Sequence, residues 1–217
     1  MEHITLTTAD GKHLAADWYS VDAPRGWVLL LHMMPATKES YRELAAELQR
    51  VGIASLAFDQ RGHGASTGGP DGYASFSNAE QQEKREDVRA AIAFLHERGM
   101  TSEHLVVVGA SIGANLALDA LTGDLAIPAA VLLSPGHIYH GISADALAGA
   151  VAPHQRVYLV AGGANDAYST ETIAALGETL ADRATVRVLD DASHGTEMFN
   201  RDAALLPDVV AWIAAQV

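Results

Sequence analysis

A serine stands between two glycines in the segment Gly109-Ala110-Ser111-Ile112-Gly113. The apolar run 105–108 precedes this segment and the helix-compatible run 114–118 follows it, so we expect a strand, a tight turn and a helix. In that context the turn lifts the serine hydroxyl clear of the sheet, and the glycines remove Cβ atoms that would collide where strand and helix meet. The pattern therefore predicts Ser111 as a nucleophile, provided that the rest of the chain supplies the context.

A serine hydroxyl needs a base to take its proton and a third group to orient that base. His194 follows a predicted strand and is the candidate base. Asp166 is the one carboxylate in the loop after the preceding predicted strand, and is the candidate orienting acid. Asp190 and Asp191 lie nearer to His194 in sequence, but a carboxylate in the same loop seldom reaches the far ring nitrogen. We interpret both as solvated.

Acyl transfer also needs two N–H donors for the oxyanion of its tetrahedral intermediate. The residue after the nucleophile supplies one, which here is the backbone N–H of Ile112. The other is expected from the loop after Leu31, at Met33 or Met34. The side chains of these methionines are interpreted as pocket wall, because only their backbone amides suit this chemistry.

Alternating strands and helices must position these groups. Strands are predicted at 4–8, 14–19, 27–31, 53–58, 105–108, 129–133, 156–161 and 185–189, and helices at 39–51, 78–98, 170–180, after Ser111 and from Pro207. Asp10-Gly11 indicates an antiparallel hairpin at the start, and the later alternation predicts a parallel sheet with helices on both faces. In such α/β sheets the working residues lie at the carboxyl ends of strands. The fold class predicted is therefore α/β, with residues 134–155 as a loop-rich stretch.

Composition excludes several classes of protein. The chain has 217 residues, a formal net charge of −13 and no cysteine. Such acidity disfavours nucleic-acid and anionic-membrane partners, and the absence of cysteine excludes disulfides and thiol nucleophiles. No apolar run approaches the ~20 residues that span a bilayer. We expect one domain over 1–217, cytoplasmic, with no membrane partner.

Two further segments carry a family resemblance. Residues 59–66, Asp-Gln-Arg-Gly-His-Gly-Ala-Ser, resemble the D-x-R-G-H-G-x-S turn of the α/β-hydrolase superfamily. The segment His32-Met33-Met34-Pro35 stands at the place of that family's H-G-x-x oxyanion loop, with Met33 where glycine is usual. The order of serine, acid and histidine also matches. The resemblance implies an α/β-hydrolase fold, Met34 as the second oxyanion donor, a structural role for His63 and no cofactor.

Within the superfamily the chain resembles small serine hydrolases and esterases related to dienelactone hydrolases, which use cysteine where this chain has serine. Residues 134–155 are too short for the helical cap of many relatives, so we expect an open site with little or no cap. Met33, Tyr139 and Tyr168 are the candidate pocket residues. A metal at His137 and His140 is an alternative, but the sequence shows no evident carboxylate partner, and we predict no metal.

The sequence therefore predicts a hydrolase that cleaves accessible carboxylic esters of small molecules through an acyl-enzyme on Ser111. A serine peptidase or thioesterase using the same residues is the alternative within enzymes. A non-catalytic binding module on the same fold is the alternative from another class. The natural ester and the oligomeric state are not predicted.

Overall fold

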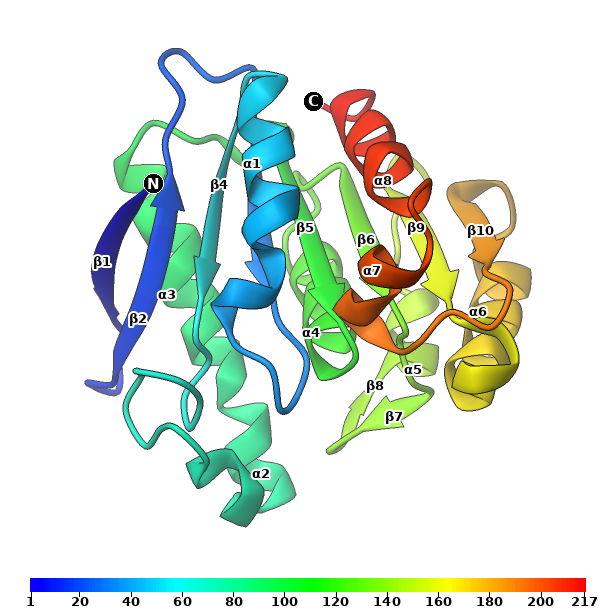
Figure 1. Ribbon diagram of the computed structural model, residues 1–217, viewed down its shortest axis with the longest axis horizontal. Helices are drawn as coiled ribbons and strands as arrows, with labels where there is room; N and C mark the ends of the chain where they lie inside the picture. Colours follow the sequence, from blue (N-terminus) through cyan, green and yellow to red (C-terminus); the bar gives the residue numbers. More distant parts are fainter.

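The computed structural model describes all 217 residues. Eight strands form one sheet in the order β1-β2-β4-β3-β5-β6-β9-β10 (Figure 1). Their bounds are β1 Glu2–Thr7, β2 His13–Tyr19, β3 Gly26–Leu31, β4 Ile53–Phe58, β5 Leu105–Ala110, β6 Ala129–Leu133, β9 Arg156–Ala161 and β10 Ala184–Val188. β2 pairs antiparallel with both β1 and β4, and every other pair in the sheet is parallel. The predicted hairpin and parallel sheet are both confirmed.

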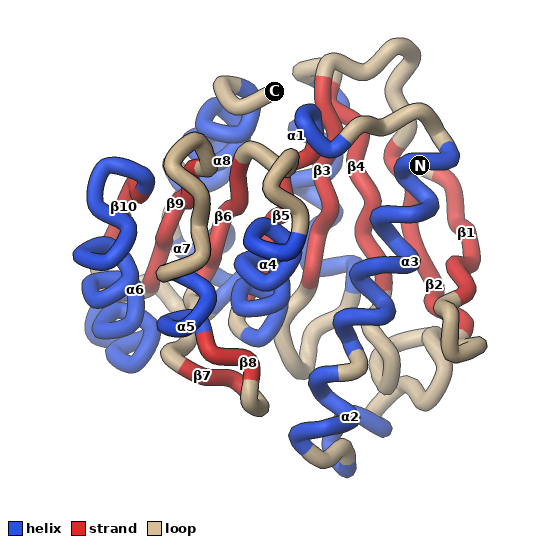
Figure 2. Tube along the Cα trace, turned by 180° about the vertical axis from the view of Figure 1, so that it is seen from behind, coloured by secondary structure: helices blue, strands red, loops and turns tan.

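Helices cover both faces of this sheet. Their bounds are α1 Arg42–Arg50, α2 Asn78–Gln82, α3 Lys84–Glu97, α4 Ile112–Gly123, α5 Ala144–Ala148, α6 Ala167–Leu180, α7 Met198–Arg201 and α8 Leu205–Ala214. α1, α7 and α8 lie on the face toward the viewer in Figure 1, and α3, α4 and α6 lie on the face seen in Figure 2. None of these helices is both long and apolar enough to cross a bilayer.

The central strands are buried on both faces and supply two separate cores. Along β3, Leu29 and Leu31 point into the core under α3, α4 and α6, whereas Val28 and Leu30 point into the core under α1 and α8. This alternation is the period of two that a strand imposes on its side chains. It explains why these strands read in sequence as continuous apolar runs instead of alternating ones.

The register of the central strands brings three loops together at one edge. Leu31 of β3 pairs with Gly109 of β5, and Ala110 of β5 pairs with Leu133 of β6. The loops that follow these strands therefore begin side by side. This is the edge where the sequence analysis expects the working residues.

Some predicted elements differ in detail. The helix predicted at 78–98 is two helices that meet at Glu83, whose carboxylate binds Arg61 at 3.0 Å. Residues 134–155 are not simply loop, since they contain the hairpin of β7 (Ile138–Tyr139) and β8 (Ile142–Ser143), followed by α5. Two-residue strands carry no periodicity that a sequence could reveal. α7 was not predicted, and α8 begins two residues before Pro207.

Candidate active site

Ser111 occupies a sharp turn between β5 and α4, with φ 54° and ψ −120°. A residue with a Cβ atom is strained at positive φ, so the surrounding structure must hold this conformation. One restraint is the Ser111 N–H, which donates to the Leu133 carbonyl at 2.9 Å. The strand, turn and helix that the sequence predicts around Ser111 are confirmed, and its side chain is only partly buried.

The two glycines of the turn mark very close backbone approaches. A Cβ on Gly109 would collide with the Gly113 carbonyl, and a Cβ on Gly113 would collide with the Leu31 carbonyl and lie 2.8 Å from the His32 oxygen. Gly113 thus allows α4 to pack directly against the end of β3. This contact sets the distance between the serine turn and the loop that begins at His32.

His32 fixes the backbone of that loop. Its Nδ1–H donates to the Met33 carbonyl at 2.9 Å, and its Nε2 accepts the Gln60 N–H at 2.9 Å. Burial, with the neighbouring His63 ring adding to it, lowers the pKa of His32 to about 3, so the ring is neutral and its tautomer follows from these two bonds. The carbonyl and N–H of one trans peptide unit point in opposite directions. His32 therefore directs the Met34 N–H away from itself.

The two backbone amides expected to hold an oxyanion have no acceptor of their own in the fold. The Met34 N–H donates to no group of the protein, and the Ile112 N–H begins α4, where no intrahelical acceptor exists. The Met33 side chain is buried, with its sulfur against Gly195. Met33 is thus a wall beside the histidine loop, and the available N–H of this loop belongs to Met34.

Asp166 and His194 form a close pair. The His194 Nδ1 lies 2.8 Å from the Asp166 Oδ1, although 28 residues separate them in sequence. Their loops are in tight backbone contact, because a Cβ on Gly162 would collide with the carbonyls of Ala192 and Ser193. Gly195, next to His194, lies against Ala110, next to Ser111, at the same edge of the sheet.

Asp166 is held in its charged form despite its burial. Burial raises the pKa of a carboxyl group, but the hydrogen bond with His194, together with the neighbouring hydroxyls of Ser134 and Ser169, outweighs it and holds the pKa of Asp166 below its usual value. Asp190 and Asp191 are exposed, in agreement with their interpretation as solvated. A charged, buried carboxylate on Nδ1 suits the orienting role predicted for Asp166.

Ser134 is a site residue that the sequence analysis missed. It follows β6 with φ 54°, is fully buried, and its Oγ accepts the Gly195 N–H at 2.8 Å. Its hydroxyl also lowers the pKa of Asp166. Ser134 therefore links the acid to the histidine loop. Its place at the carboxyl end of a parallel strand was the signal that could have identified it.

The β7–β8 hairpin brings Tyr139 into contact with Tyr168 of α6. The rings of Tyr139 and Tyr168 lie 5.9 Å apart, edge to face, and a Cβ on Gly136 would come within 2.6 Å of the first and 2.8 Å of the second. The Tyr168 hydroxyl accepts the Ile138 N–H at 3.2 Å, and its side chain is exposed. Tyr139 is half-buried.

The histidines of this hairpin do not form a metal cluster. His137 Nδ1 lies 2.9 Å from Asp145, a carboxylate partner that the sequence analysis did not find. His140 instead lies 3.1 Å from the Asn78 amide oxygen. No group of three or more His, Asp or Glu side chains able to hold a metal ion is present.

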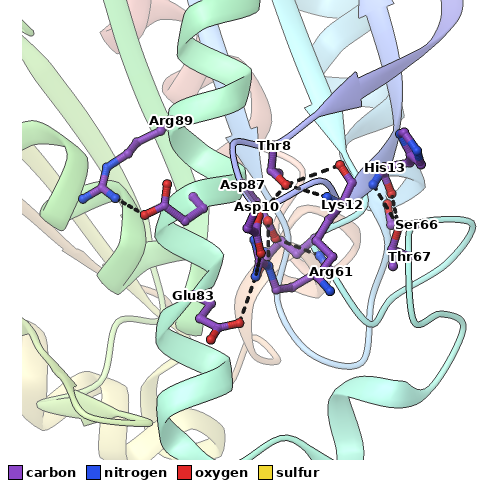
Figure 3. Close-up of polar contacts among 12 residues, drawn as sticks. Thr8, Asp10, Lys12, His13, Arg61, Ser66, Thr67, Glu83, Asp87 and Arg89 are labelled. Carbon is purple, nitrogen blue, oxygen red and sulfur yellow. Dashed lines mark hydrogen bonds and ion pairs between the residues drawn. The ribbon is translucent and has the colours of Figure 1, made fainter.

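The segment 59–66 supports the fold around the site. Arg61 binds Asp87 through its backbone N–H and its Nε, both at 2.8 Å, and reaches Asp10 and Glu83 with the rest of its guanidinium (Figure 3). The His63 ring stacks on Tyr73 with centroids 4.1 Å apart. Burial lowers the pKa of His63 to about 4. A neutral ring enclosed in this way agrees with a structural role for His63.

Five hollows that lie elsewhere on the surface have volumes between 170 and 750 Å³, and Ser111, Asp166 and His194 line none of these five. Only the short hairpin and α5 stand between β6 and β9 at this edge, so no cap domain covers it. The arrangement supplies a serine, an oriented imidazole and unpaired amides, which are the groups that nucleophilic acyl transfer uses.

Comparison with known families gives one match over residues 22–165, to the family described as serine aminopeptidase, S33. The matched range includes Ser111 and ends one residue before Asp166. Assignment of the acid and of His194 therefore rests on the geometry. A comparison with curated proteins finds no match.

Solved structures share the whole architecture at low sequence identity. An esterase of Pyrococcus furiosus superposes with a TM-score of 0.80 at 20% identity, covering 98% of this chain and 91% of the other. An α/β hydrolase from a Penicillium species gives 0.79 at 14%, with 99% and 98% covered. An esterase of Exiguobacterium antarcticum gives 0.77 at 13%, with 98% and 99% covered. At these identities the likeness concerns the fold alone.

Proposed function

The chain belongs to the serine aminopeptidase S33 family and is a hydrolase of the α/β-hydrolase fold, and we propose that it cleaves carboxylic esters through an acyl-enzyme on Ser111. Assignment to the subgroup related to dienelactone hydrolases stays a prediction. The substrate that we propose is a small, accessible ester, because no cap domain covers Ser111. No metal or cofactor takes part in the proposed reaction.

The proposed roles follow from the groups at the sheet edge. The His194 Nε2 takes the proton of the Ser111 hydroxyl as its oxygen attacks the ester carbon, and Asp166 stabilises the imidazolium that forms. The N–H groups of Met34 and Ile112 hold the oxyanion. The intermediate collapses as His194 gives the proton to the departing alcohol. A water molecule, activated by the same histidine, then attacks the acyl group and releases the acid and free Ser111.

The observation that carries this proposal is the 2.8 Å contact between Asp166 and His194 beside the serine turn. Two residues 28 positions apart meet at the edge where Ser111 is strained into the turn. A structural carboxylate–histidine pair needs no unpaired backbone amide nearby. The Met34 N–H is available, and the hydrogen bond from the neutral His32 to the Met33 carbonyl orients it; this favours catalysis over a binding role.

A serine peptidase is the second candidate, favoured by the family's description as an aminopeptidase. The same residues serve amides and thioesters, since the leaving group changes and the acyl-enzyme does not. Amide cleavage places a greater demand on protonation of the leaving nitrogen. This edge of the sheet carries no cap domain that could enclose a peptide N-terminus, which supports the ester substrate.

The test compares the wild type with Ser111→Ala on a series of p-nitrophenyl esters of increasing acyl length. We expect the variant to lose at least about 10³-fold in kcat/KM with its circular dichroism unchanged. Exposed Ser20 is replaced by alanine as the matched control and is expected to keep full activity. Equal rates in Ser111→Ala and the wild type would refute the proposal.

A fluorophosphonate probe separates catalysis from mere binding, because it forms an adduct only on an activated serine. We expect one adduct on Ser111 in the wild type and none in Ser111→Ala. Aminoacyl p-nitroanilides and acyl thioesters, measured beside the esters, decide between the substrate classes. A preference for the anilides would favour the peptidase.

A further inference from the structure

The loops that follow β3 and β4 leave the sheet side by side. Leu31 of β3 pairs with Phe58 of β4, and Figure 2 shows the two strands as neighbours. This register brings Gln60, two residues after Phe58, against His32, one residue after Leu31. Both side chains are fully buried, so the polar contacts between them form out of reach of bulk water.

Gln60 binds His32 with its backbone and with its side chain. Its N–H donates to the His32 Nε2 at 2.9 Å, and its Nε2 donates to the His32 carbonyl at 2.6 Å. Only the nitrogen end of the amide can face that carbonyl, because the oxygen end has no proton to donate. The orientation of the Gln60 amide thus follows from its acceptor.

These contacts hold both peptide units that flank Met33. The Gln60 side chain holds the unit that contains the His32 carbonyl, and the His32 Nδ1–H holds the next unit through the Met33 carbonyl at 2.9 Å. A peptide unit is planar, so fixing its carbonyl also fixes the direction of its N–H. The N–H of the second unit belongs to Met34 and donates to no group of the protein.

The His32 carbonyl also lies against the helix that begins at the serine turn. A Cβ on Gly113, the second residue of α4, would come within 2.8 Å of the His32 oxygen. This oxygen is thus close to both the Gln60 amide and the start of α4. A shift of its peptide unit would change the position of the Met34 N–H relative to Ser111.

Stability alone does not account for a glutamine at position 60. The Gln60 Nε2 donates to no acceptor except the His32 carbonyl, and no group of the protein binds the Gln60 Oε1. Burying an amide oxygen that no protein group binds costs free energy, and a methionine of the same length would bury no such oxygen. The one polar contact of the Gln60 side chain therefore serves the His32 peptide unit.

We infer that Gln60 is a positioning residue, whose side-chain amide sets the direction of the Met34 N–H toward the oxyanion. This inference rests on the proposed function, because it needs an oxyanion formed on the ester carbon. The oxyanion forms in both acylation and deacylation, and its donors act through their distance and angle to it. Loss of the Gln60 amide should therefore slow both steps without weakening the binding of the ester.

The test is Gln60→Met, which keeps the length of the side chain and removes the amide, assayed on p-nitrophenyl esters. We expect kcat to fall about tenfold or more while KM stays within about threefold, as for an interaction made only in the transition state. Gln60→Asn, whose amide is one methylene shorter and no longer reaches the His32 carbonyl, should change kcat in the same direction.

A trifluoromethyl ketone inhibitor reports the oxyanion directly. It adds to Ser111 and forms an oxyanion in the same place as the ester does. Its inhibition constant should therefore rise in Gln60→Met by the factor by which kcat/KM falls. A residue that only stabilised the fold would leave this constant unchanged, once rates and binding are expressed per site that a fluorophosphonate labels.

Gln155→Met is the matched control. Gln155 is also fully buried, and its Nε2 donates to the carbonyls of Leu121 at 2.6 Å and Ile127 at 3.0 Å. It precedes β9, however, and so lies at the opposite edge of the sheet from Ser111. The same substitution there removes at least as many hydrogen bonds and should leave both kcat and the inhibition constant unchanged.

The inference is overturned if Gln60→Met keeps its kcat, if only KM rises, or if the inhibition constant does not change. An equal loss of kcat in Gln155→Met would overturn it as well. In each of these cases Ser111-dependent turnover by the wild type still supports the proposed function. Absence of that turnover in the wild type would overturn both.

Discussion

On one side of Ser111 the histidine is buried and neutral, whereas on the other side the histidine is partly exposed and lies beside a charged carboxylate. The oxyanion side (His32, Met33, Met34, Gln60 and His63) contains His32 and Gln60, both fully buried, with both nitrogens of the His32 ring hydrogen-bonded. The base side (residues 134–139, 166–169 and 193–195) contains His194, whose side chain is 36% exposed, beside the charged Asp166.

This difference corresponds to two chemical demands. An oxyanion is stabilised best by donors that are fixed before the charge appears, and neutral buried groups achieve this without competing for it. A base must instead exchange protons with alcohol and water, so its ring needs access to solvent. The structure therefore predicts that changes on the base side act on chemistry, and changes on the oxyanion side act on geometry and stability.

The largest effect is expected from Asp166→Asn on the base side. An amide at this position donates a hydrogen bond where the carboxylate accepted one, which favours the wrong tautomer of His194. We expect kcat to fall by about 10³–10⁴-fold with the fold retained. Ester hydrolysis and thermal unfolding, measured on the same preparation, check both parts.

Asp191→Asn is the matched control for this change, because Asp191 is exposed and closer to His194 in sequence. It should keep nearly full activity. If Asp191→Asn were the impaired variant and Asp166→Asn active, the identity of the orienting acid would be wrong.

A smaller loss is expected from Gly113→Ala, which acts on the oxyanion side. The added Cβ meets the Leu31 carbonyl and lies 2.8 Å from the His32 oxygen, so β3 and its loop must move away from Ser111. Displacement of the Met34 N–H should lower kcat by about 10²-fold, as the loss of one oxyanion donor does. The measurement is kcat and KM on a short ester.

Gly123→Ala, at the far end of the same helix, is the control, since a Cβ there meets nothing within 4 Å. It is expected to leave activity unchanged. Equal activity of both alanine variants would show that the close approach of α4 to β3 does not set the oxyanion geometry.

The two sides also differ in how far the sequence could predict them. Ser111, Asp166 and His194 were predicted as site residues because parallel strands end at one edge, so position along the chain translates into position in space. Ser134, Asn115 and Ser169 were missed, although the first lies at a strand end. Their roles depend on which backbone group or side chain of another element faces them, and no local pattern records that.

The same limit applies to the β7–β8 hairpin. The sequence predicted a short excursion between β6 and β9, and Tyr139 as a pocket residue. It could not predict that Asn115 holds the hairpin against α4, because that contact joins residues 21 and 27 positions apart through an ordinary buried amide. The central strands were predicted closely because burial on both faces leaves a long apolar run.

A third prediction concerns acid stability on the oxyanion side. The pKa values of His32 and His63 are lowered to about 3 and about 4, so between pH 6.5 and about 4 the unfolded chain binds protons that the folded chain does not. The free energy of unfolding must therefore fall as the pH falls through this range, by up to about 1.4 kcal/mol per pH unit for each histidine. Urea midpoints between pH 7 and 4.5 measure the slope.

His63→Phe keeps an aromatic ring on Tyr73 and removes one titrating group, so its slope should be shallower than that of the wild type. His104→Phe, on the exposed turn before β5, leaves both buried rings in place and should retain the wild-type slope. Parallel slopes for the wild type and His63→Phe would show that His63 is not held neutral in the fold.

The smallest effect is expected behind the oxyanion side, at Lys84. Its ammonium is fully buried without a hydrogen-bond partner, and burial lowers its pKa to about 7. Since the unfolded chain holds this proton up to about pH 10.5, the cost to folding is complete below pH 7 and disappears as the pH rises toward 10.5. Lys84→Met should therefore raise the free energy of unfolding at pH 7 by about 1 kcal/mol or more, with a smaller gain at pH 10. Ester hydrolysis should be unchanged, because Lys84 stabilises no group of the proposed reaction.

Lys12→Met, at the surface turn between β1 and β2, is the control and should show no such dependence on pH. If Lys84→Met is instead less stable than the wild type, the Lys84 ammonium stabilises the charged form of the buried Asp87. The charges of Lys84, Arg61 and Asp87 then compensate one another in the folded protein.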